Sequence, residues 1–197
     1  MLPFVLFAFV ASITPGPTNI LVLSNSARYG LMAALPIVLG ACAGAAALVL
    51  LVGTGLGHLL LQWPHVQTAM AWAGVLWLSW LALGLYRAPA LDAAAAQGGP
   101  RLGLIGAAGL QVVNPKTWMM ALAVIGVFSS GAANPVTRIA LLALVFFAVS
   151  VPCLACWALL GAGSARVLRS PRALRNFNRA MALLLLGAAW SSVLLQS

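Results

Sequence analysis

The chain has 197 residues, of which 63% are hydrophobic and 6% charged, and its mean hydropathy is +1.08. A soluble domain is typically about 45–50% apolar and about 25% charged, so this composition excludes soluble globular, disordered and disulfide-stapled proteins. Ten Lys and Arg residues against one acidic residue give a net charge of +9, but the chain has too few polar residues for the solvated basic face that binds nucleic acid.

Six apolar stretches are each long enough to cross a membrane as a helix, which takes about 20 residues for a hydrocarbon core about 30 Å thick. In chain order they are residues 3–26, 34–57, 66–86, 102–130, 137–160 and 179–196. A membrane β-barrel would instead show alternating segments of about ten residues. The sequence therefore predicts an all-α integral membrane protein with six transmembrane helices.

The first span carries a helix-breaking motif near its middle. Proline lacks a backbone N–H and clashes with the preceding helical turn, and a glycine between two prolines adds backbone freedom. The motif and the polar residues beside it are Thr14, Pro15, Gly16, Pro17, Thr18 and Asn19, with Ser12 just before them. We expect the span to consist of two half-helices, and the second half-helix to expose unpaired N–H groups and a positive dipole end inside the membrane.

The fourth span contains a similar break together with a charge. Asn114-Pro115 is typical of a helix start, since asparagine caps and proline suits the first helical position. Lys116 is the only lysine in the chain, and a charge at the centre of a membrane helix costs about 2.5–3.5 kcal/mol. The lysine could instead extend to the membrane surface, but its position well inside the span favours a functional role. Gln111 and Thr117 offer further polar groups.

The two breaks, about a hundred residues apart, predict an internal duplication. Three helices per half would invert the second half relative to the first, as in many transporters whose broken helices meet at the binding site. We therefore expect one membrane domain over 1–197, with a first repeat at 1–88, a cytoplasmic linker at 89–101 and a second repeat at 102–197. The helix N-termini and Lys116 would bind an anion such as a substrate carboxylate, unless both breaks are only structural kinks.

Arginine positions predict the orientation in the membrane. The loops after the first, third and fifth helices carry Arg28, Arg87, Arg101, Arg166, Arg169, Arg172, Arg175 and Arg179. The opposite loops carry only Arg138, so the positive-inside rule puts both chain ends outside. The Arg-rich loop at 164–179 either sets this topology or contacts anionic lipid headgroups.

At these motifs the chain resembles the LysE/RhtB family of bacterial amino-acid exporters, and within it the branch that exports cysteine and O-acetylserine. The resemblance rests on residues 14–21 and on Asn114-Pro115-Lys116. It implies export of small amino acids across the inner membrane, driven by the proton gradient. Family members often carry an acidic residue where this chain has Thr18, and the only acid, Asp92, lies in the predicted linker. We therefore expect cationic substrates to be poor ones, and Lys116 becomes the candidate proton-coupling group.

The leading hypothesis is a proton-coupled exporter of small neutral amino acids or their derivatives, localised in the bacterial inner membrane. Its substrate-binding residues would be Thr14, Pro15, Gly16, Pro17, Thr18, Asn19, Asn114, Pro115 and Lys116. The alternatives are a soft-metal exporter using Cys153 and Cys156, or a membrane subunit that transports nothing. No acid–base pair lies within the spans, so we expect no enzyme activity, no metal and no cofactor. Whether the chain forms a homo-oligomer stays open.

Overall fold

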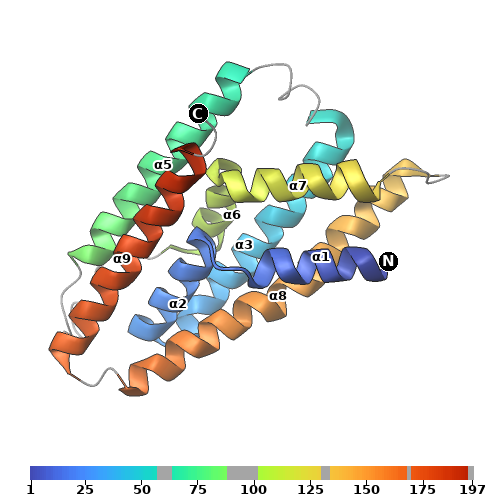
Figure 1. The fold of residues 1–197 in the computed structure, drawn as a ribbon. Coiled ribbons are helices and arrows are strands. Elements are labelled where there is room, and N and C mark those ends of the chain that lie inside the picture. The colour runs from blue at the N-terminus through green and yellow to red at the C-terminus, as the bar shows by residue number, and fades with distance from the viewer. Residues whose placement is uncertain (57–63, 88–101, 130–133, 168–169, 195–197) are drawn as a thin grey trace.

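The computed structural model describes residues 1–56, 64–87, 102–129, 134–167 and 170–194, and all regular structure in these ranges is helical (Figure 1). The helices are α1 (Leu2–Ile13), α2 (Pro17–Tyr29), α3 (Leu31–Leu51), the π-helical turn η1 (Val52–Leu56), α5 (Pro64–Tyr86), α6 (Leu104–Val113), α7 (Pro115–Phe128), α8 (Pro135–Val167) and α9 (Pro171–Leu194). The all-α prediction is confirmed for these residues. The whole of the predicted linker 89–101 lies outside them.

Two helical stretches are long and apolar enough to cross a membrane unaided, Leu31–Gly55 and Pro135–Ser164. Two bent pairs, α1 with α2 and α6 with α7, could each form one further interrupted span. Trp72–Tyr86 of α5 is a shorter apolar segment. The described residues thus provide between two and four spans by length and composition. The arrangement of six helices as two inverted repeats remains a prediction.

The predicted break in the first span is present. Helix α1 ends at Ile13, Gly16 adopts an extended backbone (φ −167°, ψ 177°), and Pro17 begins α2. The axes of the two helices differ by 56°. Because Pro17 has no N–H to donate to a preceding turn, it serves as the first residue of a new helix and does not continue the old one.

The second break forms as the sequence predicts. Asn114 is extended (φ −87°, ψ 108°) and caps α7, since its Oδ1 accepts a hydrogen bond from the Lys116 backbone N–H at 3.2 Å. Pro115 is the first residue of α7. The bend between α6 and α7 is 72°, so Lys116 lies in the first turn of a half-helix.

The predicted Arg-rich loop at 164–179 is wrong in its extent, because most of the segment is helical. Helix α8 continues to Val167 and α9 begins at Pro171. Ser170 caps α9, with its Oγ accepting from the Ala173 N–H at 3.1 Å. Hydropathy indicates where an apolar stretch ends and not where a helix ends, and arginine is a good helix former.

Helices α3 and α8 pack against each other and against the broken spans, while α5 and α9 lie side by side at one edge (Figure 1). Gly40 brings α3 so close to α6 that a Cβ would lie 2.1 Å from the Leu104 carbonyl oxygen. Gly161 does the same for α8 against Leu23 of α2, at 2.2 Å. Small residues permit such close helix packing in membranes, and here they hold one half of each broken span against a long helix.

Asn178 is a buried amide in α9 whose side chain is 1% exposed. Neither its Nδ2 nor its Oδ1 has a hydrogen-bond partner within the described residues. Such a group costs about 1–3 kcal/mol, so Asn178→Leu is expected to raise the free energy of unfolding by about that much, measured as a higher Tm in detergent. The exposed Asn176 of the same helix is the control, and Asn176→Leu should leave Tm nearly unchanged. A lower Tm in Asn178→Leu would mean that the amide is bonded in the folded protein.

Candidate functional site

The two breaks meet through Lys116. Its Nζ donates a hydrogen bond to the backbone carbonyl of Thr14 at 2.8 Å, across 102 residues of sequence. Gly16 makes this approach possible, because a Cβ at that position would lie 3.1 Å from both Cδ and Nζ of Lys116. The lysine side chain therefore crosses from α7 to the interrupted backbone between α1 and α2.

A second set of hydrogen bonds joins the breaks through side chains. Asn114 Nδ2 donates to Thr18 Oγ1 at 3.3 Å, and Gln111 Nε2 lies at the same distance from that hydroxyl. Thr117 Oγ1 donates to Gln111 Oε1 at 2.9 Å. Gln111 of α6 and Asn114 at the second break are thus bonded to the first turn of α2, and Thr117 of α7 is joined to them through Gln111.

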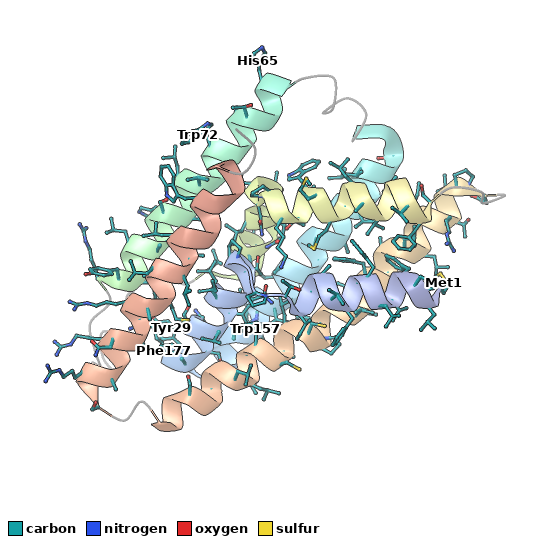
Figure 2. All side chains as sticks on the ribbon, in the orientation of Figure 1. Met1, Tyr29, His65, Trp72, Trp157 and Phe177 are labelled. Atoms are coloured by element: carbon teal, nitrogen blue, oxygen red, sulfur yellow. The ribbon has the colours of Figure 1, made fainter. Side chains whose placement is uncertain are left out.

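The first break is also held by α2 and by α8. Asn19 Nδ2 donates to the Ser12 carbonyl at 2.9 Å, which ties the two half-helices together. Trp157 of α8, labelled in Figure 2, donates from Nε1 to the Ile13 carbonyl at 3.1 Å. The hydroxyls of Ser12 and Ser150 are 2.9 Å apart. Carbonyl groups at the end of α1 that have lost their helical partners therefore find side-chain donors.

A cavity of about 410 Å³, its opening included, lies where the two breaks meet. Of the predicted binding residues, those that line it are Gly16, Pro17, Thr18, Asn19, Asn114 and Lys116. Thr14, Pro15 and Pro115 do not line it, although Thr14 supplies the carbonyl bonded to Lys116. Sequence reasoning missed the walls contributed by α3, α7 and α8, which are Ala41, Cys42, Ala45, Met120, Phe146, Ser150 and Leu154.

The electrostatic character of the cavity is positive. The first turns of α2 and α7 line it and contain no acidic residue, so both helix dipoles direct their positive ends toward it. Lys116 in the first turn of α7 opposes that dipole, a position that lowers helix stability and raises the local positive potential. Its half-buried ammonium has no carboxylate partner in the described parts of the chain, and the only acidic residue, Asp92, lies outside them. The arrangement favours an anionic group.

The two cysteines that suggested a soft-metal site, Cys153 and Cys156, differ in their solvent exposure. Cys153 is buried and Cys156 is exposed, although both belong to α8. Among the described residues, no group of three or more His, Cys, Asp or Glu side chains could hold a metal ion.

Two apolar spans are each interrupted, and the first turns of the half-helices that follow the breaks, α2 and α7, line one cavity. This arrangement is typical of a class of membrane transporter. The family model for LysE type translocators matches residues 9–195. The chain therefore belongs to the LysE family, which confirms the resemblance found in the sequence. It is a membrane transporter and not an enzyme.

Individual relatives agree with this assignment. The cysteine/O-acetylserine efflux protein of Salmonella typhimurium is 31% identical over 199 residues, covering 96% of this chain and 97% of the relative. The protein of the same name from Klebsiella pneumoniae is 26% identical over 163 residues, which is 80% of each chain. An uncharacterized membrane protein of Vibrio cholerae is 34% identical over 86 residues, 44% of this chain and 42% of that protein. No solved structure matches the chain.

Proposed function

We propose that this protein exports small neutral amino acids or their close derivatives across the bacterial inner membrane. The observation that carries the proposal is the bond between Lys116 Nζ and the Thr14 carbonyl, at the point where both broken helices meet. At this point the positively charged Lys116 ammonium lies beside a main-chain acceptor, the Thr14 carbonyl. Among the described residues, the ammonium has no carboxylate partner. An amino-acid zwitterion offers the two complementary groups.

In the proposed bound state the substrate replaces the bond between Lys116 and Thr14. Its carboxylate accepts from the Lys116 ammonium and from N–H groups in the first turn of α2, where Thr18 and Asn19 lie. Its ammonium donates to the Thr14 carbonyl, which Lys116 has released. Asn114 completes the site with its amide. The two groups that are hydrogen-bonded to each other in the structure, the Lys116 ammonium and the Thr14 carbonyl, are thus the groups that bind the two ends of the zwitterion in this proposal.

A neutral side chain suits this cavity better than a cationic one. No acidic residue lies among its lining residues, and Thr18 stands where other family members often carry a carboxylate. The names of the Salmonella and Klebsiella relatives refer to cysteine and O-acetylserine, two amino acids with short polar side chains. We infer the same class of substrate for this chain.

The proposed orientation puts the arginine-rich end of the molecule in the cytoplasm. The ends of α2 and α5 and the start of α9 lie at one end of the bundle, and Met1 lies at the other (Figure 1). Arg28, Arg87, Arg172 and Arg175 belong to that first end. Anionic lipid headgroups on the cytoplasmic surface would face the same arginines. In this orientation α2 and α6 form the cytoplasmic halves of the broken spans.

Proton coupling is the remaining part of the proposal. Lys116 would release its proton during one half of the cycle and bind one during the other, since no carboxylate lines the cavity to do so. The neutral amine of Lys116 can still donate to the Thr14 carbonyl, but hydrogen bonds from a charged donor are stronger, so loss of the proton weakens this contact.

Transport by the full-length protein in liposomes of bacterial phospholipid tests the proposal. With a pH gradient imposed, we expect labelled serine, cysteine and O-acetylserine to move against their concentration gradients, and labelled lysine to move little. A protonophore should abolish the accumulation. If none of the neutral amino acids crosses faster than in liposomes without protein, the proposed function is wrong.

A further inference from the structure

One wall of the cavity carries a pair of hydroxyl groups, one from the end of α1 just before the first break and one from the middle of α8. Ser12 of α1 and Ser150 of α8 are 5% and 3% exposed, and their Oγ atoms are 2.9 Å apart. The lining residues nearest to them in the sequence of α8, Phe146 and Leu154, are one helical turn away on either side and are apolar. Ser150 is thus a polar residue on an otherwise apolar part of α8, and it is paired with Ser12 of α1.

The pair retains hydrogen-bonding capacity. Each serine hydroxyl has one donor and two acceptor lone pairs, and a single bond between two hydroxyls uses one donor and one lone pair. One O–H group therefore stays free to donate to a third partner, and lone pairs stay free to accept. The backbone carbonyl of Ser12 accepts a hydrogen bond from Asn19. This bond holds Ser12 in place, so the free donor and acceptor groups of the pair have a fixed position.

The rest of that wall limits the size of what can bind there. Helix α3 contributes Ala41, Cys42 and Ala45, all buried. With the charged ends of a zwitterion at Lys116 and Thr14, its side chain extends into the space between α1, α3 and α8. This space suits a short side chain with a polar atom near its end.

From this geometry we propose that Ser12 and Ser150 form the subsite that selects the substrate side chain. They bind an oxygen or sulfur atom attached to the β-carbon of a small amino acid. This inference rests on the proposed function, because it takes the α-carboxylate and ammonium to be bound at the two breaks. It makes Ser150 a specificity-determining residue on a helix that carries no recognisable motif.

A hydrogen bond between two helices could also serve only to hold α1 against α8. A purely structural bond would change stability, or would change the affinity for every amino acid alike. A subsite would change the preference between substrates that differ only in the polar atom. Serine and 2-aminobutyrate are such a pair, since one carries a hydroxyl where the other carries a methyl group.

Competition against transport of labelled serine in liposomes separates these roles. In Ser150→Ala and in Ser12→Ala, we expect the preference for serine over 2-aminobutyrate to fall by about 3- to 10-fold, the effect of one neutral hydrogen bond. The double variant should lose little more than either single variant, because the two hydroxyls act as one unit. Ser24→Ala is the matched control, since Ser24 is buried in α2 outside the cavity lining and bonds the Leu21 carbonyl.

Other outcomes would contradict either the subsite alone or the proposed function as well. If Ser150→Ala and Ser12→Ala change the inhibition by both competitors equally, the subsite is wrong while the proposed function stands. If Ser24→Ala shifts the preference as strongly as they do, the subsite is also wrong. If no amino acid competes in the unmodified protein, the proposed function fails and the inference with it. Ser150→Cys keeps a polar atom and should retain more of the preference for serine than Ser150→Ala.

Discussion

Replacing Lys116 by glutamine is expected to lower the affinity for a neutral amino acid by roughly 10- to 100-fold, the effect of one hydrogen bond to a charged group. Glutamine can still donate to the Thr14 carbonyl, so the contact between the two breaks can persist. What the substitution removes is the positive charge that binds the substrate carboxylate in the proposed function. Binding to the purified protein in detergent and export in liposomes measure the two consequences.

The proposed coupling role predicts a further loss in the same variant. Glutamine cannot release a proton, so accumulation driven by a pH gradient should disappear even at saturating substrate. Lys116→Arg separates charge from proton transfer, because arginine keeps its charge and is not deprotonated in proteins. We expect this variant to bind substrate better than Lys116→Gln and to remain uncoupled.

Arg138 supplies the control for loss of a positive charge elsewhere. It lies in α8, and its Nε donates to the Phe128 carbonyl at 3.0 Å, outside the cavity lining. Arg138→Gln should leave both affinity and coupling close to those of the unmodified protein. Gradient-driven transport at the normal rate in Lys116→Gln would exclude the lysine as the coupling group, and unchanged affinity would exclude it from the binding site.

The breaks could be predicted because their residues have strong local effects. Pro17 and Pro115 each remove a backbone donor, and Asn114 caps the helix that follows, so the interruptions do not depend on the rest of the fold. The meeting of the two breaks does not follow from local effects, and the sequence predicts it only by analogy with transporters built from broken helices. The contact of Lys116 Nζ with the Thr14 carbonyl, at 2.8 Å, supports it.

The walls of the cavity could not be predicted in the same way. In a soluble protein the apolar face of a helix identifies its buried side, but α3 and α8 are apolar on almost every side. Phe146, Ser150 and Leu154 lie on the face of α8 that lines the cavity, whereas Leu144 and Leu159 are exposed. Hydrophobicity does not distinguish these faces. Only the packing of α8 against both α1 and α3 identifies which of its residues face the cavity.

Replacing Gly74 by alanine should destabilise the protein by about 1–3 kcal/mol, the usual cost of overpacking a core. Gly74 is a buried residue of α5, and a Cβ there would lie 1.9 Å from the Val113 carbonyl oxygen. Both groups are parts of rigid helical backbone, so the clash cannot be relieved by a side-chain rotation. Either α5 or the end of α6 must move. The measurement is the midpoint of thermal unfolding in detergent.

The displacement would also reach the cavity, because Val113 is the last residue of α6 and Asn114, which lines the cavity, follows it directly. Gly84 lies on the same helix, is exposed, and has no atom within 4 Å of its hypothetical Cβ among the described residues. There the higher helix propensity of alanine should stabilise by up to about 1 kcal/mol. The two substitutions thus add the same methyl group to one helix with opposite expected signs. If both variants unfold at the same temperature, α5 does not pack on the end of α6 as described.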